Sequence, residues 1–145
     1  MSFGLPKRIF FDNPDEVLTG QVQGKPASDI EERSTRAIDK LPEWSYTFQV
    51  AINPITGYLS EEKTHLINEV EIDIFARRGD QYVAILVDGE IGHFYAAWQR
   101  DADAEKTDRI NAFMHQIGQG DAVRVEFWRL ADQQMANKYY RELLI

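Results

Sequence analysis

The stretch that decides the fold is residues 69–89, which read EVEIDIFARRGDQYVAILVDG. Residues 69–76 alternate between apolar and polar side chains, as a half-buried strand does. Residues 82–87 are apolar on both faces, which is the pattern of a central strand. The connection Arg77-Arg78-Gly79-Asp80 is short enough to form a tight turn. The pattern therefore predicts a hairpin of two neighbouring strands, the second of which runs into Asp88-Gly89.

A capping box marks a helix upstream of this hairpin. In Ser28-Asp29-Ile30-Glu31 the Ser hydroxyl and the Glu carboxylate can each satisfy a free backbone N–H, so we expect a helix to begin at Ser28 and to end before Pro42. Further periodic segments predict a strand at 46–52, a helix at 101–117, a strand at 123–128 and a closing helix capped by Asp132.

The order α-β-β-β-α-β-α predicts an α/β fold. Three strands in a row, followed by a helical crossover to a fourth, imply a mixed four-stranded sheet flanked by helices, with a C-terminal helix added. We expect a single domain over residues 28–145 and an N-terminal arm over residues 1–27. Residues 58–68 fit either a further short strand or an excursion.

Composition excludes several classes of protein. Hydrophobic residues make up 43% of the 145, so a packed core is expected. There is no cysteine, which excludes disulfides and thiolate zinc sites. No stretch approaches the length of a membrane span and the first residues lack a signal-peptide pattern, so we expect a cytoplasmic protein without membrane contact. The formal net charge of −8 argues against tight, unaided DNA binding, because Lys and Arg contacts to phosphate supply most of that affinity.

Three carboxylates are expected to meet near the end of the hairpin. Asp73 lies on the polar face of the first strand, Asp88 ends the second, and Glu31 borders the apolar stripe of the first helix, whereas Glu32 is expected to point away. Such an oxygen cluster suits Mg²⁺. His93, five residues after Asp88, could transfer a proton as a general acid or base.

Each of these residues also has an ordinary structural interpretation. Asp88-Gly89 is a favoured turn pair, and Glu31 is accounted for by its capping box. Asp73 could be a solvated residue on an exposed sheet face. A single histidine such as His93, in an aromatic-rich loop, is more often packed than catalytic. Taken one at a time, these residues do not establish a site.

The order of the motifs adds a resemblance to a known superfamily. The motifs are, in chain order, Glu31; Gln49-Val50-Ala51-Ile52; Glu71-Ile72-Asp73-Ile74; Ile85-Leu86-Val87-Asp88-Gly89 with His93; Lys106-Thr107-Asp108-Arg109; and Val123-Arg124-Val125-Glu126-Phe127-Trp128. From about Ser28 to Trp128 this order resembles the PD-(D/E)XK superfamily, in particular its branch related to the very-short-patch-repair endonucleases.

The resemblance implies a restriction-endonuclease-like fold and a Mg²⁺- or Mn²⁺-dependent endonuclease that hydrolyses phosphodiester bonds in DNA. Asp73 would be the central metal ligand, and Asp88 would be a second ligand or stand at the lysine position of the motif. Glu31 would reach the metal directly or through water, and His93 would transfer a proton. Asp108 would orient His93 or pin its loop.

The sequence also departs from the pattern of that branch. Leu86 stands where much of the superfamily has Glu, and Glu90-Ile91-Gly92 replaces the aromatic residues that wedge into a duplex. With no cysteine for the structural zinc site, mismatch-specific repair is not expected. Leu86 and the net charge favour an alternative: a catalytically inactive nuclease-like domain that binds protein or nucleic acid. Residues 53–68 have no counterpart in the pattern and are either a specificity insertion or a longer hairpin.

Overall fold

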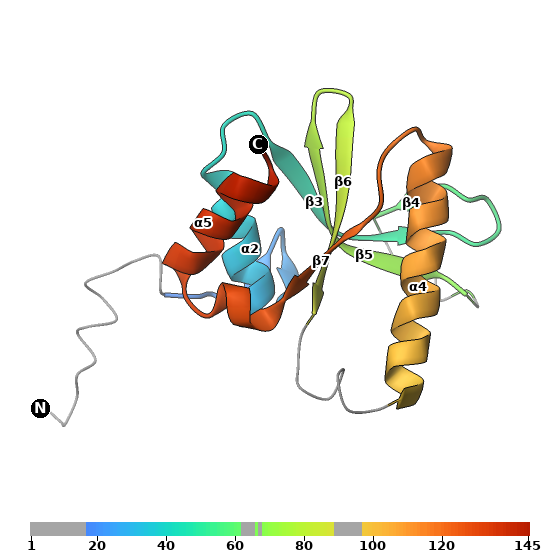
Figure 1. Cartoon of the computed structure of the whole chain (residues 1–145), viewed down its shortest axis with the longest axis horizontal. Coiled ribbons are helices and arrows are strands. Elements are labelled where there is room, and N and C mark those ends of the chain that lie inside the picture. Colours follow the sequence, from blue (N-terminus) through green and yellow to red (C-terminus); the bar gives the residue numbers. More distant parts are fainter. Residues whose placement is uncertain (1–16, 62–65, 67, 89–96) are drawn as a thin grey trace, which may run out of the picture.

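A five-stranded mixed sheet forms the centre of the molecule (Figure 1). The computed structural model describes residues 17–61, 66, 68–88 and 97–145. The strand order is β4-β3-β5-β6-β7; the first four strands pair antiparallel and β7 is parallel to β6. The strands are β3 (Ser45–Ile52), β4 (Leu59–Ser60), β5 (Val70–Arg78), β6 (Gln81–Asp88) and β7 (Val123–Glu126).

Among the residues that the structure describes, three helices accompany the sheet, and the crossover from β6 to β7 contains one of them. They are α2 (Asp29–Asp39), α4 (Ala97–Gln116) and α5 (Gln133–Leu143), and a 3₁₀ turn covers Phe127–Leu130. A small hairpin of β1 (Gln21–Val22) and β2 (Lys25–Pro26) precedes α2. Within the described residues, no helix is long and apolar enough to cross a membrane.

The α/β architecture and the helical crossover confirm the coarse prediction. The ambiguous segment 58–68 contributes the short edge strand β4, which makes the sheet five-stranded. The predicted caps are present: Ser28 and Glu31 form the capping box, and the Asp132 side chain accepts a hydrogen bond of 2.8 Å from the Met135 amide. The last strand is shorter than predicted, because the chain turns into the 3₁₀ segment after Glu126.

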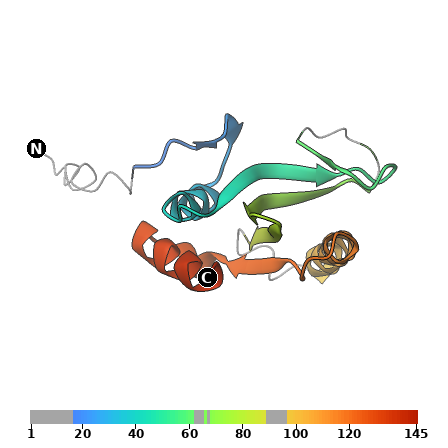
Figure 2. The same ribbon diagram turned by 90° about the horizontal axis from the view of Figure 1, so that it is seen from above.

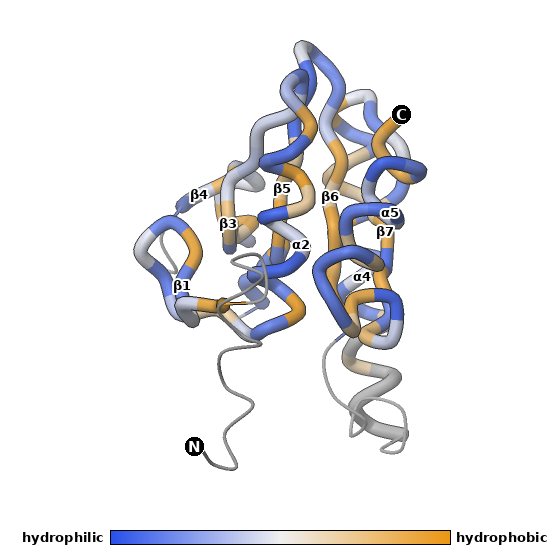
Figure 3. The backbone as a smooth tube through the Cα atoms, turned by 90° about the vertical axis from the view of Figure 1, so that its left-hand side faces the viewer, coloured by the Kyte–Doolittle hydropathy of each residue, from blue (hydrophilic) through white to orange (hydrophobic). Residues whose placement is uncertain are grey.

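Two apolar clusters pack on opposite faces of β6. Ile85 belongs to the cluster that contains residues of α2 and α5, and Leu86 belongs to the cluster that contains residues of α4. Figures 1 and 2 show α2 and α5 side by side, with α4 on the other side of the strands. The hydropathy colouring of Figure 3 shows apolar segments along β5 and β6. The prediction that residues 82–87 form a central strand is confirmed.

The apolar pattern of β5 changes face at Asp73. Val70 and Ile72 pack with α4, whereas Ile74 packs with α2 and α5. The alternation in residues 69–76 predicts that Val70, Ile72 and Ile74 share one face of the strand, and this prediction is wrong. Strict alternation holds only while both neighbouring ladders are continuous, and they are not continuous here.

The neighbouring strand β3 changes face at the same level. Phe48 packs with α2 and α5, whereas Val50 packs with α4. Between them, Gln49 has a φ of +57°, a left-handed conformation that a strand residue rarely adopts. The Lys25 ammonium of β2 holds this irregular segment, because it donates to the carbonyl oxygens of Phe48 (2.9 Å) and Gln49 (3.1 Å).

Candidate active site

Asp73 lies where β5 separates from β6. The β5–β6 ladder runs from Arg78 opposite Gln81 to Ile74 opposite Ile85 and ends there, although β6 continues to Asp88 beside β7. The β3–β5 ladder also skips Asp73, because it pairs Phe48 with Ile74 and then Val50 with Ile72. Asp73 is thus the point at which backbone pairing is interrupted on both sides.

The carboxylate of Asp73 takes over one of the missing backbone contacts. Its Oδ2 accepts a hydrogen bond of 2.9 Å from the Val87 amide, which lies past the last backbone pair of the ladder. A side-chain acceptor therefore satisfies a donor that would otherwise face the gap between the two strands. The same contact places the Asp73 carboxylate beside Val87, near the carboxyl end of β6, whereas the charges that act on it are those of Lys106, Glu31 and Glu71.

The surroundings of Asp73 perturb its proton affinity. Burial raises the pKa of Asp73 from 3.8 to about 6; the Lys106 charge and the Val87 hydrogen bond oppose this rise, and the charges of Glu31 and Glu71 add to it. A carboxyl group that titrates near neutral pH in a partly buried position is a typical mark of a functional site.

Asp73 also acts on the opposite side of the sheet. Burial raises the pKa of Tyr140, in α5, well above its usual range, and the charge of Asp73 contributes to that rise. The Asp73 carboxyl group thus interacts electrostatically with Glu31 of α2, Lys106 of α4 and Tyr140 of α5.

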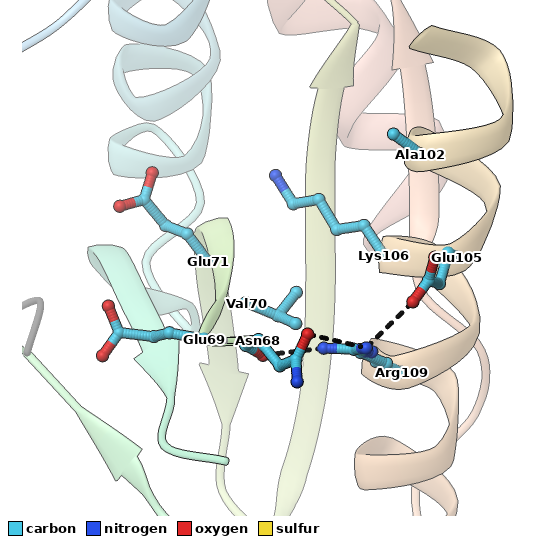
Figure 4. Close-up of a pocket in the computed structure, with 8 residues that line it drawn as sticks. All are labelled: Asn68, Glu69, Val70, Glu71, Ala102, Glu105, Lys106 and Arg109. Carbon is cyan, nitrogen blue, oxygen red and sulfur yellow. Dashed lines mark hydrogen bonds and ion pairs between the residues drawn. The ribbon is translucent and has the colours of Figure 1, made fainter. Parts of the chain in front are cut away.

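Lys106 is the site residue whose role the sequence did not predict. It extends from α4 toward β5, opposite Glu71, and both line a pocket of about 310 Å³ (Figure 4). Lys106 is half-buried, and within the part of the chain that the structure describes its ammonium makes no hydrogen bond or ion pair. The sequence signal was the run Lys106-Thr107-Asp108-Arg109, but nothing in it distinguished the lysine from a solvated one.

Arg109 closes one side of this pocket. Its guanidinium donates to the Asn68 carbonyl oxygen at 2.8 Å, and to the Glu105 carboxylate at 2.9 Å (Figure 4). The bond to Asn68 fixes α4 against the segment that leads into β5, whereas the bond to Glu105 lies within α4 and orients the guanidinium.

Asp88 has a partner of its own. It forms an ion pair with Arg124 of β7, and Arg124 also donates to the Thr107 hydroxyl at 2.9 and 3.2 Å. The parallel register places Arg124 opposite Leu86, within reach of the end of β6. The carboxylate of Asp88 therefore joins β6, β7 and α4.

Of the two adjacent glutamates at the start of α2, Glu32 does not have the orientation expected of it, whereas Glu31 is half-buried. Glu31 caps α2 and accepts from the Ser28 amide at 2.9 Å, while its charge reaches Asp73. Glu32, expected to point away from the core, is only 3% exposed. Its carboxylate accepts from the backbone amides of Thr19 (2.9 Å) and Gly20 (2.8 Å), because the segment before β1 folds over this side of α2.

The pKa of Glu32 shows what holds it in place. Burial alone would raise this pKa, but the hydrogen bonds from Thr19 and Gly20 and the charge of Arg36 outweigh it and lower the value. Ionised Glu32 thus joins α2 to the preceding segment through hydrogen bonds, and it is not one of the residues whose charge acts on Asp73.

Two further residues of the predicted site are His93 and Asp108. His93 lies outside the described residues, and Asp108 is exposed on α4. Among the residues that the structure describes, no group of three or more His, Cys, Asp or Glu side chains is arranged to hold a metal ion. Comparison with family models, with curated proteins and with solved structures found no match to this chain.

Proposed function

We propose that this protein is a metal-dependent nuclease of the PD-(D/E)XK type, with a restriction-endonuclease-like fold, that hydrolyses phosphodiester bonds of DNA at the site around Asp73. The observation that carries the proposal is the position of Asp73: a partly buried carboxyl group with a pKa of about 6, at the point where β5 separates from β6. A charged group in such a place is costly unless something compensates it.

The residues around Asp73 fit a hard divalent cation. Mg²⁺ binds through one or two carboxylates and completes its coordination with water and substrate phosphate oxygens, so it does not need a cage of three protein ligands. Asp73 would hold the ion, and Glu31 and Glu71 are the carboxylates whose negative charge already acts on it. Bound there, Mg²⁺ or Mn²⁺ would polarise a phosphodiester and lower the pKa of an attacking water.

Lys106 supplies the positive charge on the other side of the site. Its half-buried ammonium lies on the α4 wall of the pocket and is the main charge that favours ionised Asp73. In the proposed reaction Lys106 binds a phosphate oxygen of the substrate, since its ammonium has no hydrogen-bonded carboxylate partner among the residues that the structure describes. Asp88, which Arg124 holds, would position the end of β6 beside this centre.

A second candidate function is nucleic-acid or protein binding without cleavage. The observations that favour it are Leu86, which is 2% exposed and packed in the α4 cluster where the motif has an acid, and the occupied carboxylate of Asp88. A non-catalytic descendant would keep the packing of the sheet but would not depend on the charge of Asp73.

Cleavage assays distinguish the two functions. Supercoiled plasmid and single-stranded DNA are incubated with the wild-type protein in Mg²⁺ or Mn²⁺, and in EDTA as a blank. Asp73→Asn should abolish metal-dependent cleavage. Asp80→Asn is the matched control, because it makes the same change at an exposed turn of the same hairpin.

The proposal fails if purified wild-type protein cleaves neither substrate with either metal. It also fails if Asp73→Asn and Asp80→Asn cleave at the same rate, because the activity then belongs to another site or to a contaminant. DNA binding without cleavage by both variants would support the second candidate.

A further inference from the structure

A second pocket, of about 390 Å³, adjoins the first. The two share Asn68, Val70 and Arg109, so a single wall of residues separates them. The new pocket lies between α4 and the loop that joins β3 to β4, which is the segment without a counterpart in the nuclease motif order. Its volume falls in the range of about 300–1,000 Å³ that is typical of small-ligand sites.

The lining of this second pocket combines flat apolar surface with amide groups. Ile52, Pro54 and the half-buried Phe113 supply the apolar part, and Asn53 and Gln116 supply the amides. This combination suits a nucleobase, whose faces are apolar and stack on aromatic rings, and whose edges form hydrogen bonds with amide side chains.

The β3–β4 loop has a defined conformation that keeps the pocket open. The Asn53 carboxamide oxygen accepts from the Ile55 amide at 2.9 Å and from the Thr56 amide at 3.2 Å. The Asn53 amide donates to the Tyr58 carbonyl oxygen at 3.0 Å, and Gly57, with a φ of +73°, donates to the Asn53 carbonyl oxygen at 2.8 Å. A loop ordered by its own hydrogen bonds loses little entropy when a ligand binds.

The same loop exposes an aromatic side chain. Tyr58 is 76% exposed and follows Gly57, which lines the pocket. Tyr58 therefore adjoins in sequence a pocket that Phe113 lines, and exposed aromatic side chains are surfaces on which the bases of single strands stack.

We propose that the second pocket binds one unpaired base of a DNA strand whose phosphate reaches the Asp73–Lys106 site. This inference rests on the proposed function, and it names the substrate class: a single-stranded or locally unpaired strand. Asn68 and Arg109 lie between the two pockets, where the sugar and phosphate that connect base and scissile bond would pass. The β3–β4 loop is then the specificity insertion, and not merely a longer hairpin.

The proposal is tested by binding and not by turnover. Fluorescence anisotropy of labelled strands is measured in Ca²⁺ with the full chain carrying Asp73→Asn. Three probes of equal length are compared: a single strand, its duplex, and a single strand whose sugars lack bases. We expect the intact strand to bind at least about tenfold more tightly than the other two, which is the loss expected for one stacked base.

Filling the pocket provides the structural control. Ala112 is exposed on α4 and lines the second pocket, so Ala112→Phe should occupy the space of the base and remove the preference for the intact strand. Ala104→Phe makes the same change at an exposed position of α4 that lines neither of the two pockets, and it should keep the preference. Gln116→Ala, which only removes an exposed amide, should weaken the preference without challenging folding.

The outcomes separate this inference from the nuclease proposal. A base-dependent preference that Ala112→Phe removes and Ala104→Phe retains supports the pocket, even if the wild-type protein cleaves nothing with Mg²⁺ or Mn²⁺. Equal affinity for the three probes overturns the pocket, even if cleavage is observed. The same conclusion follows if Ala112→Phe and Ala104→Phe bind alike.

Discussion

Replacing the carboxyl group of Asp73 by an amide should stabilise the protein at neutral pH. Burial gives folded Asp73 a pKa of about 6, against 3.8 for the ordinary group, so the folded protein holds this proton more tightly than the unfolded chain does. Well below pH 3.8 both states are protonated, and Asp73 does not lower the stability of the folded protein. As the pH rises from 4 to 6 the unfolded chain ionises first, and the stability of the wild type falls.

The size of this cost follows from the two pKa values. At about 1.4 kcal/mol per tenfold change in proton affinity, the interval from 3.8 to about 6 corresponds to about 3 kcal/mol above pH 6. The amide that replaces the carboxyl group in the variant would carry no such cost, and its oxygen can still accept the Val87 hydrogen bond. We therefore expect Asp73→Asn to be up to about 3 kcal/mol more stable than wild type at pH 8, and to lie within about 1 kcal/mol of it at pH 4.

Urea denaturation at pH values between 4 and 8, in EDTA, measures this difference directly. Asp80→Asn, at the exposed turn of the hairpin, is the control and should follow the wild-type curve. Addition of Mg²⁺ at pH 8 should narrow the gap between wild type and Asp73→Asn, because a bound cation favours the ionised carboxylate. An Asp73→Asn curve parallel to wild type from pH 4 to 8, or a less stable variant at pH 8, would show that Asp73 is not held at a destabilising position.

Three further predictions concern the residues around the site. Glu32→Gln should lower the free energy of unfolding by about 2 kcal/mol at pH 7, because charged hydrogen bonds are lost. In urea titrations the difference between wild type and Glu32→Gln should shrink as the pH falls below 4.5, where ionised Glu32 takes up a proton. A difference that does not change with pH would contradict this prediction. Arg124→Met should cost about 3 kcal/mol by leaving Asp88 without its ion pair, and the double variant with Asp88→Asn should recover part of that loss in the same assay. Lys106→Met should raise the pKa of Asp73 further, because the Lys106 charge opposes the rise caused by burial. NMR titration of the Asp73 carboxyl carbon measures this pKa, and an unchanged value would show that the charge of Lys106 does not act on Asp73.

The sequence predicts the elements of this fold better than it predicts their contacts. Alternation in residues 69–76, the apolar run at 82–87 and the capping box at Ser28 are local signals, and the structure contains the strand or helix that each one predicts. The burial of Glu32 was missed because it depends on Thr19 and Gly20, which fold back onto α2 from outside the periodic segments.

The ion pair of Asp88 was missed for a similar reason. Its partner, Arg124, comes 36 positions later and is brought alongside only by the parallel register of β6 and β7. The sequence pattern predicts a strand at residues 123–128, but it does not show which side chain of that strand faces the end of β6. The local turn signal of Asp88-Gly89 was therefore the stronger one, although the contact with Arg124 determines where the carboxylate lies.

The structural role of Asp73 accounts for a polar side chain at this position, but not for its negative charge. At Gln49 and Asp73 the ladder is interrupted on two neighbouring strands, and one consequence is that the Val87 amide needs a side-chain acceptor. Asparagine would meet that need as well as aspartate, and without the cost of about 3 kcal/mol that an ionised carboxylate incurs there. Packing and hydrogen bonding therefore explain a polar residue at position 73, but they do not explain a charge. A bound cation or a transferable proton would explain it, and for this reason we assign the chemistry to Asp73 before any other residue of the site.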